Sequence, residues 1–313
     1  MENKEKNFVS AVIYVRNAEK RIGRFLQAII TVMEEHFEHS EIICVNDFSD
    51  DESVKVIRQV VSRRETAVSV SILNMGCFHG LEIAMNAGVD LAIGDFVFEF
   101  DNTILDFKKE KIMEIYYRSL QGYDIVSASL NQKEHFTSSL FYRVFERFTD
   151  PPYKMGTESF RILSRRGINR IGSMNRAVPY RKAIYANSGL KIDNKKYEAT
   201  GNINIRVDKK EKNYRLGLAV DSLLLFTEVG YRFSIAMTAL MMFMSVFMLI
   251  YSVLIYITSN PAAGWTTTIL FLSAAFFGVF GILTIITKYL QLLVRLVFRR
   301  KQYSYESIEK LTK

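Results

Sequence analysis

The chain has 313 residues, of which 49% are hydrophobic and 24% are charged, and its formal net charge is +8. Two cysteines are too few for a disulfide-stabilised fold, and we expect Cys44 and Cys77 to stay unpaired. A basic chain can indicate nucleic-acid binding. Much of the basic excess lies in residues 161–212 and after Lys288, however, so anionic lipid headgroups explain it better and we expect no nucleic-acid partner.

The first hundred residues alternate short apolar runs with patterns of helical spacing. Runs rich in β-branched and aromatic residues predict buried strands at residues 8–15, 41–45, 67–73 and 95–101. Apolar residues at helical spacing predict helices at residues 21–37, 53–64 and 81–92. This alternation predicts an α/β fold, a Rossmann-like, mostly parallel sheet with helices on both faces.

The pattern is less regular after residue 122. Residues 138–148 predict a helix that ends before Asp150-Pro-Pro, and residues 186–206, rich in Asn, Lys and Gly, predict hairpins or a loop. Residues 215–227 carry apolar side chains on one side, which predicts an amphipathic helix lying on a bilayer, and residues 291–298 predict another.

Two uncharged apolar runs, residues 233–257 and 266–287, are each long enough for a helix to cross a bilayer. A core hairpin of a water-soluble protein is the alternative, which their length and lack of charge disfavour. Basic residues follow the second run, and the segment between the runs is uncharged, so both ends of the hairpin should face the cytoplasm. The charged residues 1–7 lead into no signal-peptide apolar region.

We therefore predict four segments in a multi-pass protein of the inner (plasma) membrane with both termini cytoplasmic. They are a cytosolic α/β domain at residues 1–212, an interfacial amphipathic helix at 213–232, a two-helix transmembrane hairpin at 233–287 and a basic cytosolic tail at 288–313. The predicted partners include the lipid bilayer, and a homo-oligomer remains open.

Candidate site residues follow the second and fourth predicted strands. Ligands of parallel sheets bind beyond the carboxyl ends of the strands, where this prediction places Asn46-Asp47 and Asp101-Asn102-Thr103. Asp47 could instead cap the next helix. The first strand is followed by neither G-x-G-x-x-G nor a P-loop, which argues against dinucleotide and nucleoside-triphosphate sites of those types.

The order of several short motifs resembles one known family. Residues 12–17 resemble V-I-P-x-Y-N, residues 41–51 E-I-I-x-V-D-D-G-S-x-D, residues 74–95 N-x-G…A-x-x-x-G…G-D, residues 101–103 D-A-D, and residues 159–166 D-F-R-L-x-x-R-R. With two apolar runs at the end, this order resembles the family 2 (GT-A) glycosyltransferases of the polyisoprenyl-phosphate type, which include dolichol-phosphate mannose synthase and bacterial undecaprenyl-phosphate sugar transferases.

The resemblance implies an inverting transfer of a sugar from a nucleotide-sugar, with a UDP-sugar favoured, to polyprenyl (undecaprenyl) phosphate. It implies nucleotide contacts by Tyr14, Arg16, Asn17, Val45, Asn46, Asp47, Asn74, Asn102 and Thr103. It implies catalytic roles for Asp101 and Arg161, and contacts to the diphosphate or the acceptor phosphate by Arg143, Arg206 and Lys209. It also implies a divalent metal, Mg or Mn, on Asp101.

Several residues depart from the family pattern. Tyr14 replaces a Pro, Arg16 a Tyr, Asn46 an Asp and Ser159 an Asp, and Thr103 replaces the second Asp of D-x-D, which predicts a weakened metal site. Glu99, on the same face of its strand as Asp101, could assist the metal or sit in the core, and Arg161 could simply pair with a surface carboxylate. The alternative function is a catalytically weakened homologue acting as a membrane scaffold or a lipid-phosphate binding protein.

Overall fold

The computed structural model describes residues 4–131, 158–173, 181–186, 188–200 and 303–312, together with isolated positions between 217 and 293. The described strands are β1 (Val9–Val15), β2 (Ser40–Asn46), β3 (Ser69–Met75), β4 (Phe96–Phe100), β5 (Ile125–Leu130), β6 (Phe160–Ser164), β7 (Ile192–Tyr197) and β8 (Tyr305–Lys310). The described helices are α1 (Glu19–His36), α2 (Ser53–Ser62), α3 (Leu81–Leu91), α4 (Glu110–Leu120), α6 (Arg165–Ser173) and α7 (Arg181–Ala186).

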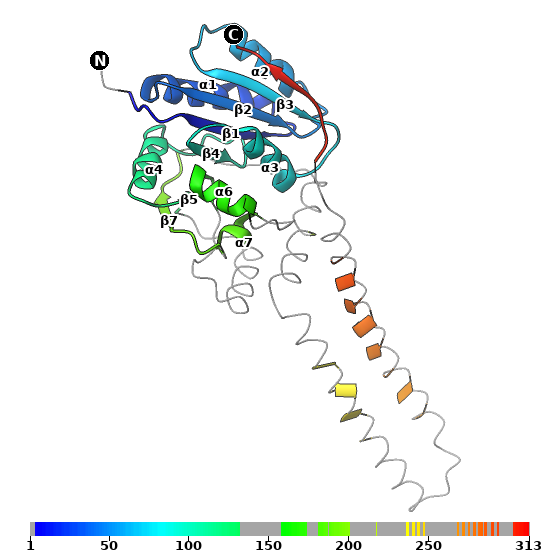
Figure 1. Ribbon diagram of the computed structural model, residues 1–313. Helices are drawn as coiled ribbons and strands as arrows, with labels where there is room; N and C mark the ends of the chain where they lie inside the picture. The colour runs from blue at the N-terminus through cyan, green and yellow to red at the C-terminus, as the bar shows by residue number, and fades with distance from the viewer. Residues whose placement is uncertain are drawn as a thin grey trace, which may run out of the picture.

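The strands form one mixed sheet in the order β7-β5-β6-β4-β1-β2-β3-β8 (Figure 1). The four predicted strands are confirmed as β1 to β4, which run parallel to one another. β6 pairs antiparallel with both β4 and β5, and β7 pairs parallel with β5. Since β1 to β4 point the same way, their carboxyl ends lie along one edge of the sheet.

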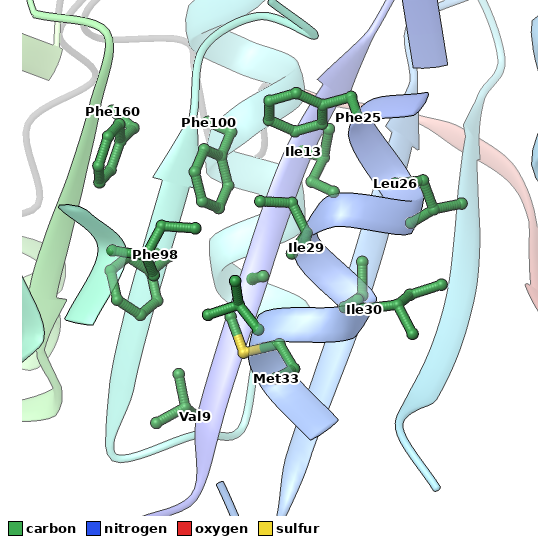
Figure 2. Close-up of a cluster of buried hydrophobic side chains, with 14 of the residues drawn as sticks. Val9, Ile13, Phe25, Leu26, Ile29, Ile30, Met33, Phe98, Phe100 and Phe160 are labelled. Atoms are coloured by element: carbon green, nitrogen blue, oxygen red, sulfur yellow. The ribbon is translucent and has the colours of Figure 1, made fainter. Parts of the chain in front are cut away.

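One face of the sheet carries the larger apolar core, which α1, α2 and α4 cover. Phe25 and Ile29 of α1 lie against Phe98 and Phe100 of β4, as Figure 2 shows. The rings of Phe25 and Phe100 meet edge to face with their centroids 5.4 Å apart. The helical spacing that predicted α1 therefore corresponds to the stripe buried against this face.

The opposite face is covered by α3, α6 and α7. Residues of α3 pack on Val12, Ile43, Val45 and Val97, and residues of α6 and α7 pack on Ile125 and Leu163. The predicted helices on both faces are thus confirmed for the described elements.

Gly88 permits the close approach of α3 to the sheet. A Cβ at this position would lie 2.4 Å from Cγ1 of Val12 and 2.6 Å from Cγ2 of Val45. Both neighbours are β-branched side chains on buried strands, so neither can move away easily. The missing side chain therefore sets the distance between α3 and the parallel strands.

We expect Gly88→Ala to lower the free energy of unfolding by about 1–3 kcal/mol, because the added methyl overpacks this contact. Gly172→Ala is the matched control in α6, since a Cβ there meets nothing within 4 Å. It should change stability by less than about 1 kcal/mol and in the favourable direction. Denaturant unfolding of both variants measures the difference, and equal effects would contradict the packing argument.

The end of the chain adds a strand that the sequence analysis did not identify. β8 pairs antiparallel with β3, with Leu73 opposite Ile308, and forms the edge of the sheet. Arg58 of α2 binds Glu309 through two hydrogen bonds of 2.9 and 2.7 Å. β8, which lies in the predicted basic tail, thus belongs to the same sheet as β1, β2 and β3 (Figure 1).

The other predictions for the second half of the chain have mixed outcomes. Within residues 186–206, the prediction of hairpins or a loop is wrong for β7, which joins the sheet beside β5. The predicted helix at residues 138–148 lies outside the described residues, as do nearly all positions of 215–227 and 291–298 and most of the two apolar runs. Among the positions that the structure describes, we find no helix with both the length and the apolar character needed to cross a bilayer.

Candidate active site

The shared edge at the carboxyl ends of β1 to β4 gathers most of the predicted site residues that the structure describes. β1 leads into Arg16-Asn17, β2 into Asp47-Phe48, and β4 into Asp101-Asn102-Thr103. The segment from Gly76 to Gly80 joins β3 to α3 along the same edge. The topology of parallel strands therefore places these residues together, as expected for a ligand site in such a sheet.

Asp47 is fully buried and connects three of these elements. Its Oδ1 accepts the backbone N–H of His79 at 2.8 Å, and its Oδ2 accepts the N–H of Gly80 at 2.8 Å. Oδ2 also accepts the hydroxyl of Tyr14 at 3.0 Å. Asp47 thus holds the β3–α3 loop against the ends of β1 and β2. Asp47 does not cap α2, whose N-cap residue is Glu52; in the turn before this helix, Oδ1 of Asp51 accepts the N–H of Ser53 at 3.0 Å.

Arg16 organises the loop after β2. Its Nη1 donates to the carbonyl oxygens of Asp47 at 2.7 Å and Phe48 at 2.6 Å, and its guanidinium carbon lies 4.3 Å from the centre of the Phe78 ring. Asn17 accepts the N–H of Asp50 at 2.9 Å through its side-chain oxygen. Phe48 has a positive φ of 55° and a ring that is about half exposed. Left-handed backbone is costly for a bulky residue and is common at binding sites.

Hydrogen bonds between polar side chains connect the ends of β2 and β3 with β8. The side chain of Asn46 donates to that of Asn74 at 2.9 Å, and Asn74 donates to the hydroxyl of Ser307 at 3.1 Å. Val45, the neighbour of Asn46, is buried under α3. The C-terminal strand therefore contributes to the edge that the sequence analysis assigned to the nucleotide.

Asp101 lies in a network of buried charges rather than alone at the strand end. Arg161 of β6 stands opposite Glu99 in the strand register, and its Nη1 lies 2.7 Å from Oε2 of Glu99. Its Nη2 binds Oδ2 of Asp101, and its Nε lies 3.0 Å from Oε2 of Glu158. The Arg161 side chain has no exposed surface. Arg161 thus pairs with carboxylates, as one of the two interpretations held, although these carboxylates are buried rather than at the surface. Its predicted catalytic role stays a prediction.

Arg181 of α7 completes this network from the opposite side. Its Nη2 lies 2.7 Å from Oδ1 of Asp101, its Nη1 lies 2.8 Å from Oε1 of Glu99, and its Nε lies 2.8 Å from Oε2 of Glu82 in α3. The Tyr185 hydroxyl donates to Oε1 of Glu99 at 2.9 Å. Glu99 therefore sits in the core as a partner of two arginines.

The network fixes the charge of Asp101. Burial opposes ionisation of this carboxyl, but the positive charges of Arg161, Arg181 and Lys182 outweigh burial and hold its pKa well below the ordinary value. Burial also opposes the charge of Arg161, yet Asp101, Glu158 and Glu99 keep the pKa of its guanidinium well above the ordinary value. Asp101 and Arg161 are therefore both ionised near neutral pH.

The residues around Asp101 do not fit a divalent metal in this arrangement. Each carboxylate oxygen of Asp101 already accepts a guanidinium, from Arg161 or Arg181. Thr103, at the second position of the expected pair, is buried and carries no charge, and the side chain of Asn102 accepts the N–H of Ile104 at 2.8 Å. Across the described part of the chain, no three His, Cys, Asp or Glu side chains are grouped so that they could hold a metal ion.

Arg181, Glu82, Tyr185 and the contribution of β8 to the site were not predicted from the sequence. Arg181 lies 80 residues beyond Asp101, and no local pattern links the two. The predicted phosphate contacts Arg143, Arg206 and Lys209 lie outside the described residues.

A family model described as "Glycosyl transferase family 2" matches residues 10–171, about half of the chain. This match spans β1 to β6 and therefore the carboxyl ends of β1 to β4, but it includes neither Arg181 of α7 nor β8. The chain belongs to glycosyl transferase family 2. The resemblance inferred from the motifs is thereby confirmed at the level of the family.

Individual relatives agree with this assignment. An uncharacterised glycosyltransferase of Synechocystis sp. is 30% identical over 184 residues, which cover 57% of this chain and 57% of that protein. An undecaprenyl-phosphate 4-deoxy-4-formamido-L-arabinose transferase of Aeromonas hydrophila is 27% identical over 134 residues, which cover 43% of this chain and 40% of that protein. The chain thus spans roughly half the length of these family 2 relatives.

A solved structure agrees with the fold. Mannosyl-3-phosphoglycerate synthase from Rubrobacter xylanophilus superposes with a TM-score of 0.50 at 16% identity, covering 69% of this chain and 74% of that one. At this identity the likeness concerns the fold alone, and it agrees with the predicted α/β architecture of the family.

Proposed function

We propose that this family 2 protein transfers a sugar from a nucleotide-sugar, with a UDP-sugar favoured, to polyprenyl phosphate at a membrane surface. The observation that carries the proposal is the convergence of Tyr14, Arg16, Asn46, Asp47 and Asp101 on the carboxyl edge of four parallel strands in a family 2 fold. The Aeromonas hydrophila relative is named as an undecaprenyl-phosphate sugar transferase, which supports undecaprenyl phosphate as the acceptor.

The chemistry of the acceptor suits a site without a strong general base. A phosphate monoester loses its second proton near pH 6, so it is already a nucleophile at neutral pH. In an inverting transfer, an oxygen of the acceptor phosphate forms a bond to the anomeric carbon while the bond from that carbon to the nucleoside diphosphate breaks. The main tasks of the protein are then to hold both anions in line and to stabilise the departing diphosphate.

The described contacts divide these tasks among named residues. Asp47 holds the β3–α3 loop through the N–H groups of His79 and Gly80, which shapes the edge proposed to receive the nucleotide. Arg161 and Arg181 keep Asp101 ionised and fixed at the end of β4. Such rigid positioning of charge is what a preorganised transfer site requires.

Two observations support a membrane location. Several described positions in the predicted apolar runs carry large apolar side chains that are about half exposed or more, among them Leu240, Phe243, Phe247 and Val279. In addition, β8 pairs with β3, so the tail lies on the same side as the N-terminal domain. This pairing does not itself indicate a membrane, but it agrees with the proposed hairpin, which would return the chain to the side from which it entered, and with two cytoplasmic termini in the inner membrane.

The closed ion-pair network at Asp101 favours a second candidate, a homologue of weakened activity that binds lipid phosphate as a scaffold. The two candidates make different predictions in one assay. Full-length protein in detergent is incubated with labelled UDP- and GDP-sugars and undecaprenyl phosphate, and the lipid phase is analysed by mass spectrometry.

Transfer of one sugar to the lipid, lost in Asp101→Asn protein that retains its circular dichroism spectrum, is the expected result. Failure of every donor, together with retained binding of undecaprenyl phosphate, would establish the scaffold instead.

A further inference from the structure

The arrangement around Asp101 bears on how the donor diphosphate is held. Asp101 contributes one carboxylate at the end of β4, and Arg161 and Arg181 bind its two oxygens from two sides. Only about a tenth of its side-chain surface is exposed. Both oxygens of the aspartate that the resemblance assigned to a metal are thus already paired with arginines.

Both arginines are fixed by more than Asp101. Arg161 is held by Glu99 at 2.7 Å and by Glu158 at 3.0 Å, and Arg181 by Glu99 at 2.8 Å and by Glu82 at 2.8 Å. A metal ion at Asp101 would have to displace guanidinium groups whose side chains are 0% and 1% exposed. Moving a buried guanidinium away from its carboxylates costs several kcal/mol.

A second carboxylate next to Asp101 could offset this cost by binding the metal ion, but the chain has none at the expected position. Thr103 offers a buried hydroxyl where the family pattern has an Asp, and a neutral hydroxyl is a weak ligand for Mg²⁺ or Mn²⁺. No alternative group of ligands exists within the described ranges.

We infer that Asp101 is the counter-ion of Arg161 and Arg181 and that this protein binds its nucleotide donor without a divalent metal. In this account the two guanidinium groups occupy both carboxylate oxygens of Asp101 and keep the end of β4 rigid. The inference rests on the proposed function for the identity of the donor, but its metal part concerns only the residues around Asp101.

The first measurement uses Mn²⁺ as a paramagnetic probe of the full-length protein in detergent. Electron paramagnetic resonance should show no stoichiometric loss of the free Mn²⁺ signal, either for the wild type or for Asp101→Asn. Stoichiometric binding by the wild type that disappears in Asp101→Asn would overturn the inference. This readout needs no donor, so it holds even if the proposed function fails.

The second measurement is the affinity for UDP, by calorimetry with EDTA or with Mn²⁺. The inference expects affinities that agree within a factor of about three. A gain of more than about tenfold with Mn²⁺, equivalent to about 1.4 kcal/mol, would overturn it. If UDP and GDP bind under neither condition, the proposed nucleotide site is wrong, and the Mn²⁺ titration alone decides the metal question.

Discussion

Replacing Arg161 with Met should lower the free energy of unfolding by about 3–5 kcal/mol, the largest loss that we expect from one substitution. Met fills similar space but leaves Glu99 without one of its two arginines and Asp101 without one of its two. Glu99 is fully buried, so water cannot replace the lost charge. Denaturant unfolding of the full-length protein followed by circular dichroism measures the loss.

Arg166→Met is the matched control for this prediction. Arg166 follows β6 in α6 and binds Asp124 at 2.8 Å; the Arg166 side chain is 72% exposed and that of Asp124 is 4% exposed. Without Arg166, Asp124 still accepts hydrogen bonds from the hydroxyl of Ser164 at 3.0 Å and the N–H of Lys191 at 3.3 Å, and water screens the exposed guanidinium, so we expect a smaller loss of about 1 kcal/mol. Comparable losses in the two variants would mean that burial of the Asp101 network does not matter for stability.

Asp47→Ala should have the second-largest effect, on both stability and donor binding. The substitution removes the acceptor for the N–H groups of His79 and Gly80 and for the hydroxyl of Tyr14. Hydrogen bonds to a charged group contribute about 1.5–3 kcal/mol each, and unpaired buried donors cost more. We expect a loss of about 3 kcal/mol in unfolding free energy and at least tenfold weaker donor binding, about 1.4 kcal/mol.

Asp50→Ala tests whether this effect is specific to the buried carboxylate. Asp50 lies in the same loop, three residues after Asp47, but its side chain is 64% exposed and its only ion pair among the described residues, with Arg16, measures 3.7 Å. We expect a stability change below about 1 kcal/mol. Calorimetric UDP titration and thermal unfolding of both variants decide the matter. An Asp47→Ala protein as stable as Asp50→Ala would refute the proposed role of Asp47 in holding the β3–α3 loop.

The sequence predicted the parallel half of the sheet because its strands are buried on both faces. Continuous apolar runs such as those of β1 and β2 are typical of such strands, and the helical stripe of α1 matches the face that it covers. β8 could not be found in this way. Most of its residues are exposed and it pairs with a strand more than 200 residues earlier, so it has neither an apolar pattern nor a nearby partner.

The site was predictable only where it lies next to a strand end. Asp47 and Asp101 follow apolar runs, so topology alone placed them on one edge of the sheet. Their partners come from elsewhere in the chain. The backbone donors of His79 and Gly80 leave no mark in the side-chain pattern, and Arg181 reaches Asp101 from a short helix 80 residues away. Glu99 sits in the core because it pairs with Arg161 and Arg181. No spacing rule in the sequence reveals the contact with Arg181, so the two alternatives for Glu99 could not be separated from the sequence.

Photo-crosslinking tests the central claim most directly, namely that the carboxyl edge of β1 to β4 binds a nucleotide-sugar. Full-length protein is irradiated with a photoreactive UDP-sugar, with and without excess UDP, and the labelled peptides are identified by mass spectrometry. The account predicts UDP-protected labelling within residues 14–17, 46–50 or 74–80. Protected labelling confined to residues distant from this edge, such as α4 or β7, would contradict it.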